Sequence, residues 1–168
     1  SKGLSVAVGD EGGFAPDLSG EEEALDIIVK AIENAGYKAN EDFKISLDVA
    51  ASEWKTNQVG EYLMPKKNKQ MNTDELIEMW EEISDKYPIF SIEDPLDEED
   101  WKGWEKITEK LGDKIRLVGD DLFVTNVKRL KRGLKNKCAN AILIKPNQIG
   151  TVTAVSYTHL RAHETLSD

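Results

Sequence analysis

Three carboxylates and one amine stand at the ends of four short apolar runs in this 168-residue chain. Carboxylates gathered in one place would raise one another's pKa unless a cation lay among them. Oxygen ligands without histidine or cysteine favour magnesium or calcium, and a site that leaves room for water and substrate favours magnesium. The pattern therefore predicts a Mg²⁺ site. The three carboxylates are those of Asp48, Glu93 and Asp120, and the amine is that of Lys145.

Lys145 stands at the last of these run ends and is the candidate base. The charge of a nearby metal ion would lower the pKa of its ammonium toward the range in which a neutral amine can accept a proton. A base beside a metal can remove a proton from a carbon next to a carboxylate, while the metal stabilises the negative charge that develops. The residue types alone therefore predict metal-assisted proton abstraction from a carboxylate substrate.

The apolar runs are predicted strands, and helical patterns separate them. Alternating strands and helices give a parallel sheet whose carboxyl ends all lie on one side. The steps from Glu93 to Asp120 and on to Lys145 are 27 and 25 residues, which is one strand–helix unit each. The 45 residues from Asp48 to Glu93 leave room for an additional hairpin. This is the repeat of a (β/α)8 barrel, which carries its active site at the carboxyl ends of its strands.

The predicted fold class is α/β: a partial (β/α)8 TIM-type barrel of about five strand–helix units that does not close within this chain. A closed barrel needs roughly 250 residues. Residues 4–8 are predicted to form the first strand, and the pairs Ser19 with Glu22 and Asn72 with Glu75 predict capping boxes at two helix starts. Tryptophans at helical spacing are predicted to pack in the core: Trp80, Trp101 and Trp104.

The acidic composition excludes some classes of partner. The chain has 22 Lys plus Arg against 32 Asp plus Glu, and its net charge of −10 opposes binding to nucleic acids or anionic membranes. The single cysteine, Cys138, excludes an internal disulfide and fits a reducing compartment. Because the chain has neither a membrane-spanning apolar run nor a signal-peptide pattern, we expect a cytoplasmic protein.

Five segments, taken in order, resemble the enolase family: 8–16, 46–53, 91–95, 118–126 and 144–150. The resemblance implies a glycolytic lyase, phosphopyruvate hydratase, that dehydrates 2-phosphoglycerate to phosphoenolpyruvate with Mg²⁺. It implies that Glu11 donates the proton that assists departure of the hydroxyl, and that Lys145 accepts the substrate proton and contacts the substrate. The magnesium ligands that it implies are the three predicted above: Asp48, Glu93 and Asp120.

The resemblance also implies a division of the chain. Residues 1–155 are similar to the central part of the C-terminal barrel domain of a bacterial-type enolase, and the absence of an initial methionine fits an internal fragment. Residues 156–168 do not resemble the family at this point, and we interpret them as a foreign tail, so neither His159 nor His163 is assigned a role. We expect the complete parent to be a homo-oligomer and the fragment to be inactive.

Two alternatives to this function remain open. Family members are also reported at cell surfaces or secreted, so the chain could belong to a non-catalytic surface-binding protein. It could also belong to another Mg²⁺-dependent enzyme of the same superfamily that acts on a different carboxylate. The paired glycines Gly12 and Gly13 beside Glu11 disfavour this second alternative.

Overall fold

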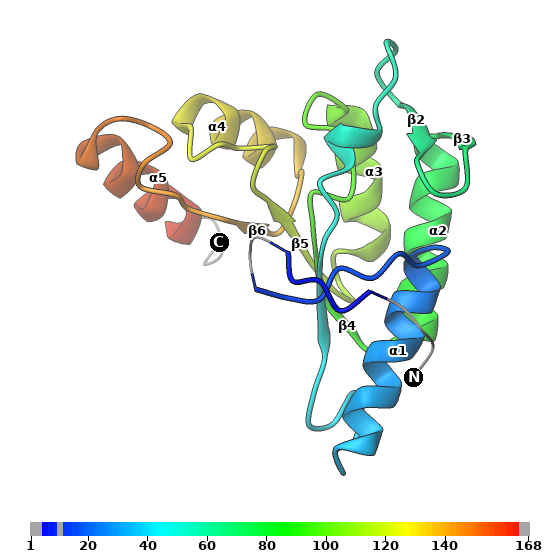
Figure 1. Cartoon of the computed structure of the whole chain (residues 1–168). Coiled ribbons are helices and arrows are strands. Elements are labelled where there is room, and N and C mark those ends of the chain that lie inside the picture. The colour runs from blue at the N-terminus through cyan, green and yellow to red at the C-terminus, as the bar shows by residue number, and fades with distance from the viewer. Residues whose placement is uncertain (1–4, 10–11, 165–168) are drawn as a thin grey trace.

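Four parallel strands form the central sheet of the computed structural model, which describes residues 5–9 and 12–164 (Figure 1). The strands are adjacent in the order β1, β4, β5, β6, and each neighbouring pair is parallel. The sheet is open, since β1 and β6 are its outer strands. The strands are β1 (Ile45–Asp48), β4 (Ile89–Glu93), β5 (Arg116–Gly119) and β6 (Ala141–Ile142).

Helices alternate with these strands, as the sequence predicts. A helix precedes β1 and a helix lies between each later pair of strands, so every crossover is a strand–helix–strand unit. This arrangement confirms the predicted α/β partial barrel that does not close. The helices are α1 (Glu21–Asn34), the short 3-10 helix η1 (Ala51–Trp54), α2 (Thr73–Lys86), α3 (Trp101–Leu111), α4 (Val127–Asn136) and α5 (Val152–Glu164).

The additional residues between β1 and β4 form the predicted hairpin. Strands β2 (Glu61–Met64) and β3 (Lys69–Asn72) pair antiparallel near the top of Figure 1. The Tyr62 hydroxyl, fully buried, donates to Oδ2 of Asp100 at 3.0 Å, and the Thr73 hydroxyl donates to the same oxygen at 2.6 Å. Since Asp100 caps the start of α3, these hydrogen bonds fix the hairpin to that helix.

The predicted core tryptophans are buried: Trp80, Trp101 and Trp104 are 1, 5 and 0 % exposed. The indole Nε1 of Trp80 donates to the carbonyl of Pro95 at 3.0 Å. The indole of Trp104 donates to the carbonyl of Asp97 at 3.2 Å. Buried polar groups are stable when they are hydrogen-bonded, so both indoles hold the segment that follows β4 against the helical layer.

One of the two predicted capping boxes is present. At α2 the Asn72 side chain accepts from the backbone of Glu75, whose carboxylate accepts from the Asn72 N–H. At α1 the prediction is wrong, because Gly20 is the N-cap residue and makes no side-chain cap. Instead, the backbone N–H and hydroxyl of Ser19 both donate to Oε2 of Glu23 at 2.9 Å. The helix begins one residue later than predicted, so Glu23 replaces Glu22.

The predicted first strand, 4–8, is not formed in the part that the structure describes. Val8 makes an isolated antiparallel bridge with Phe14 instead. Val6, Val8 and Phe14 are 77, 60 and 75 % exposed, so this segment gains little from burial. A strand in the sheet requires a hydrogen-bonded neighbour, and the outer strand β1 pairs with β4 alone among the named strands.

Helix α5 packs against α4 and includes the first part of the predicted tail. Thr158 is fully buried, and its hydroxyl donates to the carbonyl of Thr125 at 3.1 Å. The foreign origin of residues 156–168 stays a prediction. Within the described residues, no helix has the length and apolar character that crossing a bilayer requires.

Candidate metal centre and catalytic base

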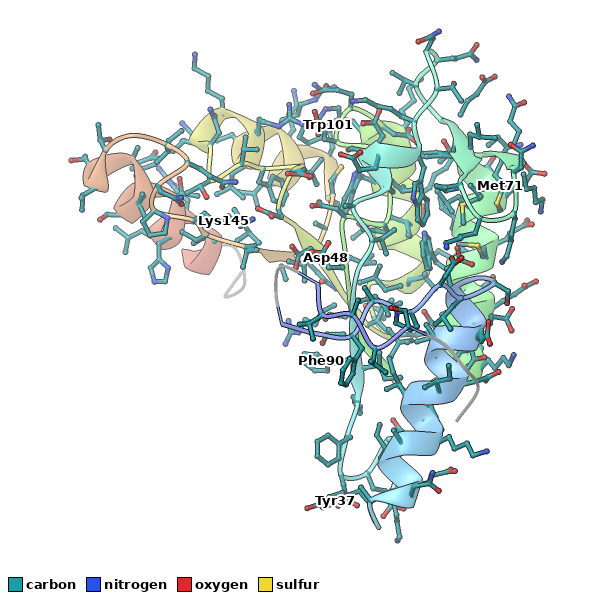
Figure 2. All side chains as sticks on the ribbon, viewed as in Figure 1. Tyr37, Asp48, Met71, Phe90, Trp101 and Lys145 are labelled. Atoms are coloured by element: carbon teal, nitrogen blue, oxygen red, sulfur yellow. The ribbon has the colours of Figure 1, made fainter. Side chains whose placement is uncertain are left out.

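The parallel register brings the charged strand ends to one level. Asp48, the last residue of β1, pairs with Glu93, the last residue of β4. Glu93 pairs in turn with Val118 of β5, and Asp120 follows two residues later. Lys145 lies shortly after β6; Figure 2 shows Asp48 near the centre of the view and Lys145 to its left. The predicted site residues therefore come from four adjacent strands.

Three carboxylates form a tight group at this edge. Glu93, Asp94 and Asp120 each offer a carboxylate oxygen, and these atoms all lie within 4.8 Å of one another. Two of the three are predicted metal ligands, whereas Asp94 is not. The third predicted ligand, Asp48, lies outside this group and is exposed. Its charge nevertheless acts on Glu93, since it is one of the causes that raise the pKa of that residue.

The group is electrostatically unfavourable when all its members are ionised. Burial raises the pKa of Glu93 to about 7, and the nearby charges of Asp48, Asp120 and Asp94 act in the same direction. Burial also raises the pKa of Asp94 to about 6, although hydrogen bonds from backbone N–H groups oppose the shift. Glu93 and Asp94 thus retain a proton more readily than in water, and a cation would remove this repulsion.

Asp120 is the best-placed candidate ligand of the group. It is 6 % exposed, and its Oδ1 atom is buried without a hydrogen-bond partner among the described residues. A buried carboxylate oxygen without a partner is costly unless an ion or water satisfies it. This oxygen, together with the all-oxygen donor set, fits a hard divalent cation such as Mg²⁺.

The other oxygen of Asp120, Oδ2, accepts a hydrogen bond from Nζ of Lys145. This pairing raises the pKa of Lys145. From the sequence, a lowered pKa of Lys145 is predicted when the site holds a metal ion. The raised pKa belongs to the cluster without a cation, in which no metal ion offsets the negative charge of Asp120. The Lys145 side chain is 43 % exposed and therefore accessible from solvent.

The backbone of Lys145 is fixed by a residue that the sequence analysis missed. The N–H of Lys145 donates to the hydroxyl of Thr125 at 2.9 Å, and that hydroxyl donates to Oε1 of Gln148 at 2.9 Å. Thr125 is fully buried and has a φ of 54°. A left-handed β-branched residue is uncommon, and this one joins the turn after β5 to the candidate base, Lys145.

Glu11, the predicted proton donor, lies outside the described residues. The loop around it is closed by a hydrogen bond from the N–H of Gly9 to the carbonyl of Gly13 at 2.8 Å. Gly12 has a φ of 89°, a conformation that side chains rarely adopt. Glycine at this position is therefore required by the backbone of the loop.

A comparison with protein families gives one match that covers nearly the whole chain. The family described as "Enolase, C-terminal TIM barrel domain" matches residues 1–165. The matched range includes all strands of the central sheet, the hairpin and all five α-helices.

Proposed function

The chain belongs to the enolase C-terminal TIM barrel domain family, and from this premise we propose that it is part of a phosphopyruvate hydratase. The family supports a lyase of the enolase superfamily. The proposed reaction is the glycolytic dehydration of 2-phosphoglycerate to phosphoenolpyruvate. The observation that carries the proposal is the hydrogen bond between Lys145 and Asp120, which joins a candidate base to a candidate ligand.

We assign Mg²⁺ as the cofactor and Asp48, Glu93 and Asp120 as the residues that would hold it. Two observations support this assignment: Oδ1 of Asp120 has no hydrogen-bond partner among the described residues, and the pKa of Glu93 is raised. When bound, the ion would neutralise the carboxylates and stabilise the negative charge that develops on the substrate carboxylate. The cross-strand neighbours Asp48 and Glu93 would reach it from two parallel strands.

Lys145 is the proposed proton acceptor and a substrate-binding residue. It acts in its neutral form: Nζ takes the proton from C2 of the substrate, and the electron pair of the broken C–H bond remains on the substrate. Two of its contacts suit this role. Its backbone is fixed by Thr125, and the side chain reaches Asp120 at the neighbouring strand end. The ordinary ammonium would have to lose its proton first, which requires a change in the surrounding charge.

Glu11 is the proposed proton donor. As the C3–O bond breaks, the departing hydroxide would take the Glu11 proton and leave as water, while the electron pair left at C2 forms the C2–C3 double bond. The glycines around Glu11 support the assignment, because they allow a backbone path that other residues resist. Acid and base would thus belong to different loops, which keeps the two proton transfers separate.

The finer parts of the proposal concern the complete protein. We propose that residues 1–155 are the central part of the barrel of a bacterial-type enolase and that 156–168 are a foreign tail. The complete enzyme would be a cytoplasmic homo-oligomer with a small-molecule substrate and no nucleic-acid partner. The acidic net charge of −10 supports the last point.

Two measurements on the complete enzyme test this function. Conversion of 2-phosphoglycerate, followed by the absorbance of phosphoenolpyruvate, is expected with Mg²⁺ and is expected to stop after chelation. A panel of other carboxylates with an acidic α-proton tests for a different superfamily reaction. Turnover of one of these, without turnover of 2-phosphoglycerate, would replace the proposed substrate. Absence of turnover on all of them would favour the surface-binding alternative.

A further inference from the structure

We propose that Asp94 is a positioning residue of the metal centre: its carboxylate holds the turn 120–122, and thereby places the Asp120 carboxylate for the cation. This inference rests on the proposed function, because it concerns the same site. No role is predicted for Asp94 from the sequence. The inference thus gives a role to the one member of the tight carboxylate group that is not a predicted ligand.

Three consecutive backbone N–H groups donate to Asp94. The N–H of Asp120 donates to Oδ1 at 3.1 Å, and the N–H of Asp121 donates to Oδ2 at 2.9 Å. The N–H of Leu122 is also directed at Oδ1, at 3.5 Å. These three residues are the first of the turn that follows β5. Hydrogen bonds to an ionised acceptor are about twice as strong as those between neutral groups, so the carboxylate fixes the turn.

The backbone of Asp94 connects two other strand ends. Its N–H donates to the carbonyl of Val118 in β5 at 3.0 Å, and its carbonyl accepts from the N–H of Ala51, after β1, at 3.1 Å. Asp94 has a φ of 42°, in the left-handed region that aspartate tolerates better than most residues. One residue therefore joins the carboxyl ends of β1, β4 and β5.

The same contacts make Asp94 unsuited to be a cation ligand. Both of its oxygens already accept backbone hydrogen bonds, and the residue is 3 % exposed. Asp120 differs, because its Oδ1 is buried without a partner in the described part of the chain. We therefore separate the two roles: Asp120 binds the cation and Asp94 sets where Asp120 stands. Residues that orient a metal ligand commonly change metal affinity by about 10- to 100-fold when replaced.

The variant Asp94→Asn tests this separation. It keeps the shape of the side chain but places an NH₂ group against a backbone N–H, so at least one of the three donors loses its acceptor. We call the hydrogen bonds from the N–H groups of residues 120–122 to the Asp94 carboxylate the clamp. Two matched controls remove a carboxylate but leave these hydrogen bonds in place. Asp121→Asn keeps the backbone N–H that bonds to Asp94 but removes a neighbouring charge. Asp97→Asn removes a carboxylate of similar burial, which accepts hydrogen bonds from Ser52 and Lys55.

Two quantities are measured on the complete enzyme: the Mg²⁺ dissociation constant by calorimetry, and amide hydrogen exchange of residues 120–122. In the unchanged enzyme the three amides are expected to be protected. In Asp94→Asn at least one of them should exchange about 10- to 100-fold faster, as the loss of a hydrogen bond to a charged group implies. The Mg²⁺ dissociation constant should rise by about 10-fold or more, while both controls stay within about twofold of the unchanged enzyme.

Several outcomes would overturn the inference. If the amides of Asp121 and Leu122 are unprotected in the unchanged enzyme, the inference is wrong. This test needs no variant, so it still decides if Asp94→Asn does not fold. Weaker Mg²⁺ binding with unchanged amide exchange would make Asp94 a direct ligand. An equal loss of affinity in Asp121→Asn would make the effect one of charge alone. An enzyme that binds no Mg²⁺ and forms no phosphoenolpyruvate would refute the proposed function, while the exchange of the three amides would still decide on the clamp.

Discussion

Nζ of Lys145 donates a hydrogen bond to Oδ2 of Asp120, across the ends of the neighbouring strands β5 and β6. The contact pairs the candidate base with a candidate ligand, so both proposed roles use one carboxylate. A cation at the other oxygen, Oδ1, would draw the negative charge of Asp120 away from the lysine and add a positive charge beside it. Both effects favour the neutral amine that a base requires.

We predict that, in the complete enzyme, Lys145→Ala abolishes exchange of the C2 proton of 2-phosphoglycerate with solvent. Loss of a positioned base typically costs about 10²- to 10⁴-fold in rate. Glu11→Gln, in contrast, should spare this exchange and block loss of the hydroxyl. Proton exchange followed by NMR in deuterated water, together with phosphoenolpyruvate release, measures both. Retained C2 exchange in Lys145→Ala would contradict the assignment of the base.

Asp120→Asn is expected to raise the Mg²⁺ concentration needed for half-maximal turnover by about 10- to 100-fold. The amide keeps the shape of the side chain but loses a unit of charge, and hard cations prefer charged oxygens. The measurement is turnover as a function of Mg²⁺ concentration. Asp121→Asn is the matched control and should leave the requirement unchanged. The reverse result would mean that Asp121, not Asp120, is the ligand.

The raised pKa of Glu93, about 7 against a usual value of 4.5, predicts how metal-free stability depends on pH. A raised folded-state pKa contributes stability that is fully present below pH 4.5 and is lost as the pH rises through about 7. Asp94, with a pKa of about 6, acts in the same direction. The Tm of the metal-free enzyme should therefore fall between about pH 5 and pH 8, and Mg²⁺ should raise it more at pH 8 than at pH 5.

Glu93→Gln is the variant that isolates this effect. It removes the titrating group, so the metal-free Tm should depend less on pH between about pH 5 and pH 8. The stabilisation by Mg²⁺ at pH 8 should also shrink, because a proposed ligand is lost. Scanning calorimetry with and without chelator measures both quantities. A variant that keeps the full pH dependence would show that the slope comes from other groups.

The chain of 168 residues is expected to show no conversion of 2-phosphoglycerate at any Mg²⁺ concentration. Among the described residues its four-stranded sheet has two unpaired outer edges, so the rim of a closed barrel is not assembled there. Misplacement of catalytic groups by about 1 Å can cost on the order of a hundredfold in rate. The assay is the one for phosphoenolpyruvate, in excess Mg²⁺. Replacing residues 156–168 by a short polar tail should not change this result. Turnover that depends on His159 and His163 would contradict the interpretation of the tail.

Much of the fold could be predicted because it depends on local patterns. The strand ends at Asp48 and Glu93, the hairpin between them and the buried Trp80 and Trp104 all follow from apolar runs and their spacing. The wrong capping box at α1 has a different cause. A shift of one residue in the helix start changes which glutamate reaches Ser19, and sequence patterns locate helix ends poorly.

The site was predicted less completely than the fold. The types and order of Glu93, Asp120 and Lys145 indicated where charge would gather, since parallel strands end on one side. Asp94 and Thr125 were missed, because their importance lies in hydrogen bonds to residues more than 15 positions away in the chain. Left-handed backbone at a non-glycine residue has no clear sequence signal. An aspartate directly after a strand-end glutamate was the only available indication.

The buried indoles of Trp80 and Trp104 provide a spectroscopic probe of the sheet edge that carries the candidate site. Their Nε1 atoms bond to the carbonyls of Pro95 and Asp97, only two and four residues beyond Glu93. Indole emission responds to the polarity and hydrogen bonding around the ring, so displacement of this segment changes the intrinsic fluorescence of the protein. A cation that displaced this segment on binding to the carboxylate cluster would therefore be detectable optically, without any label attached to the chain.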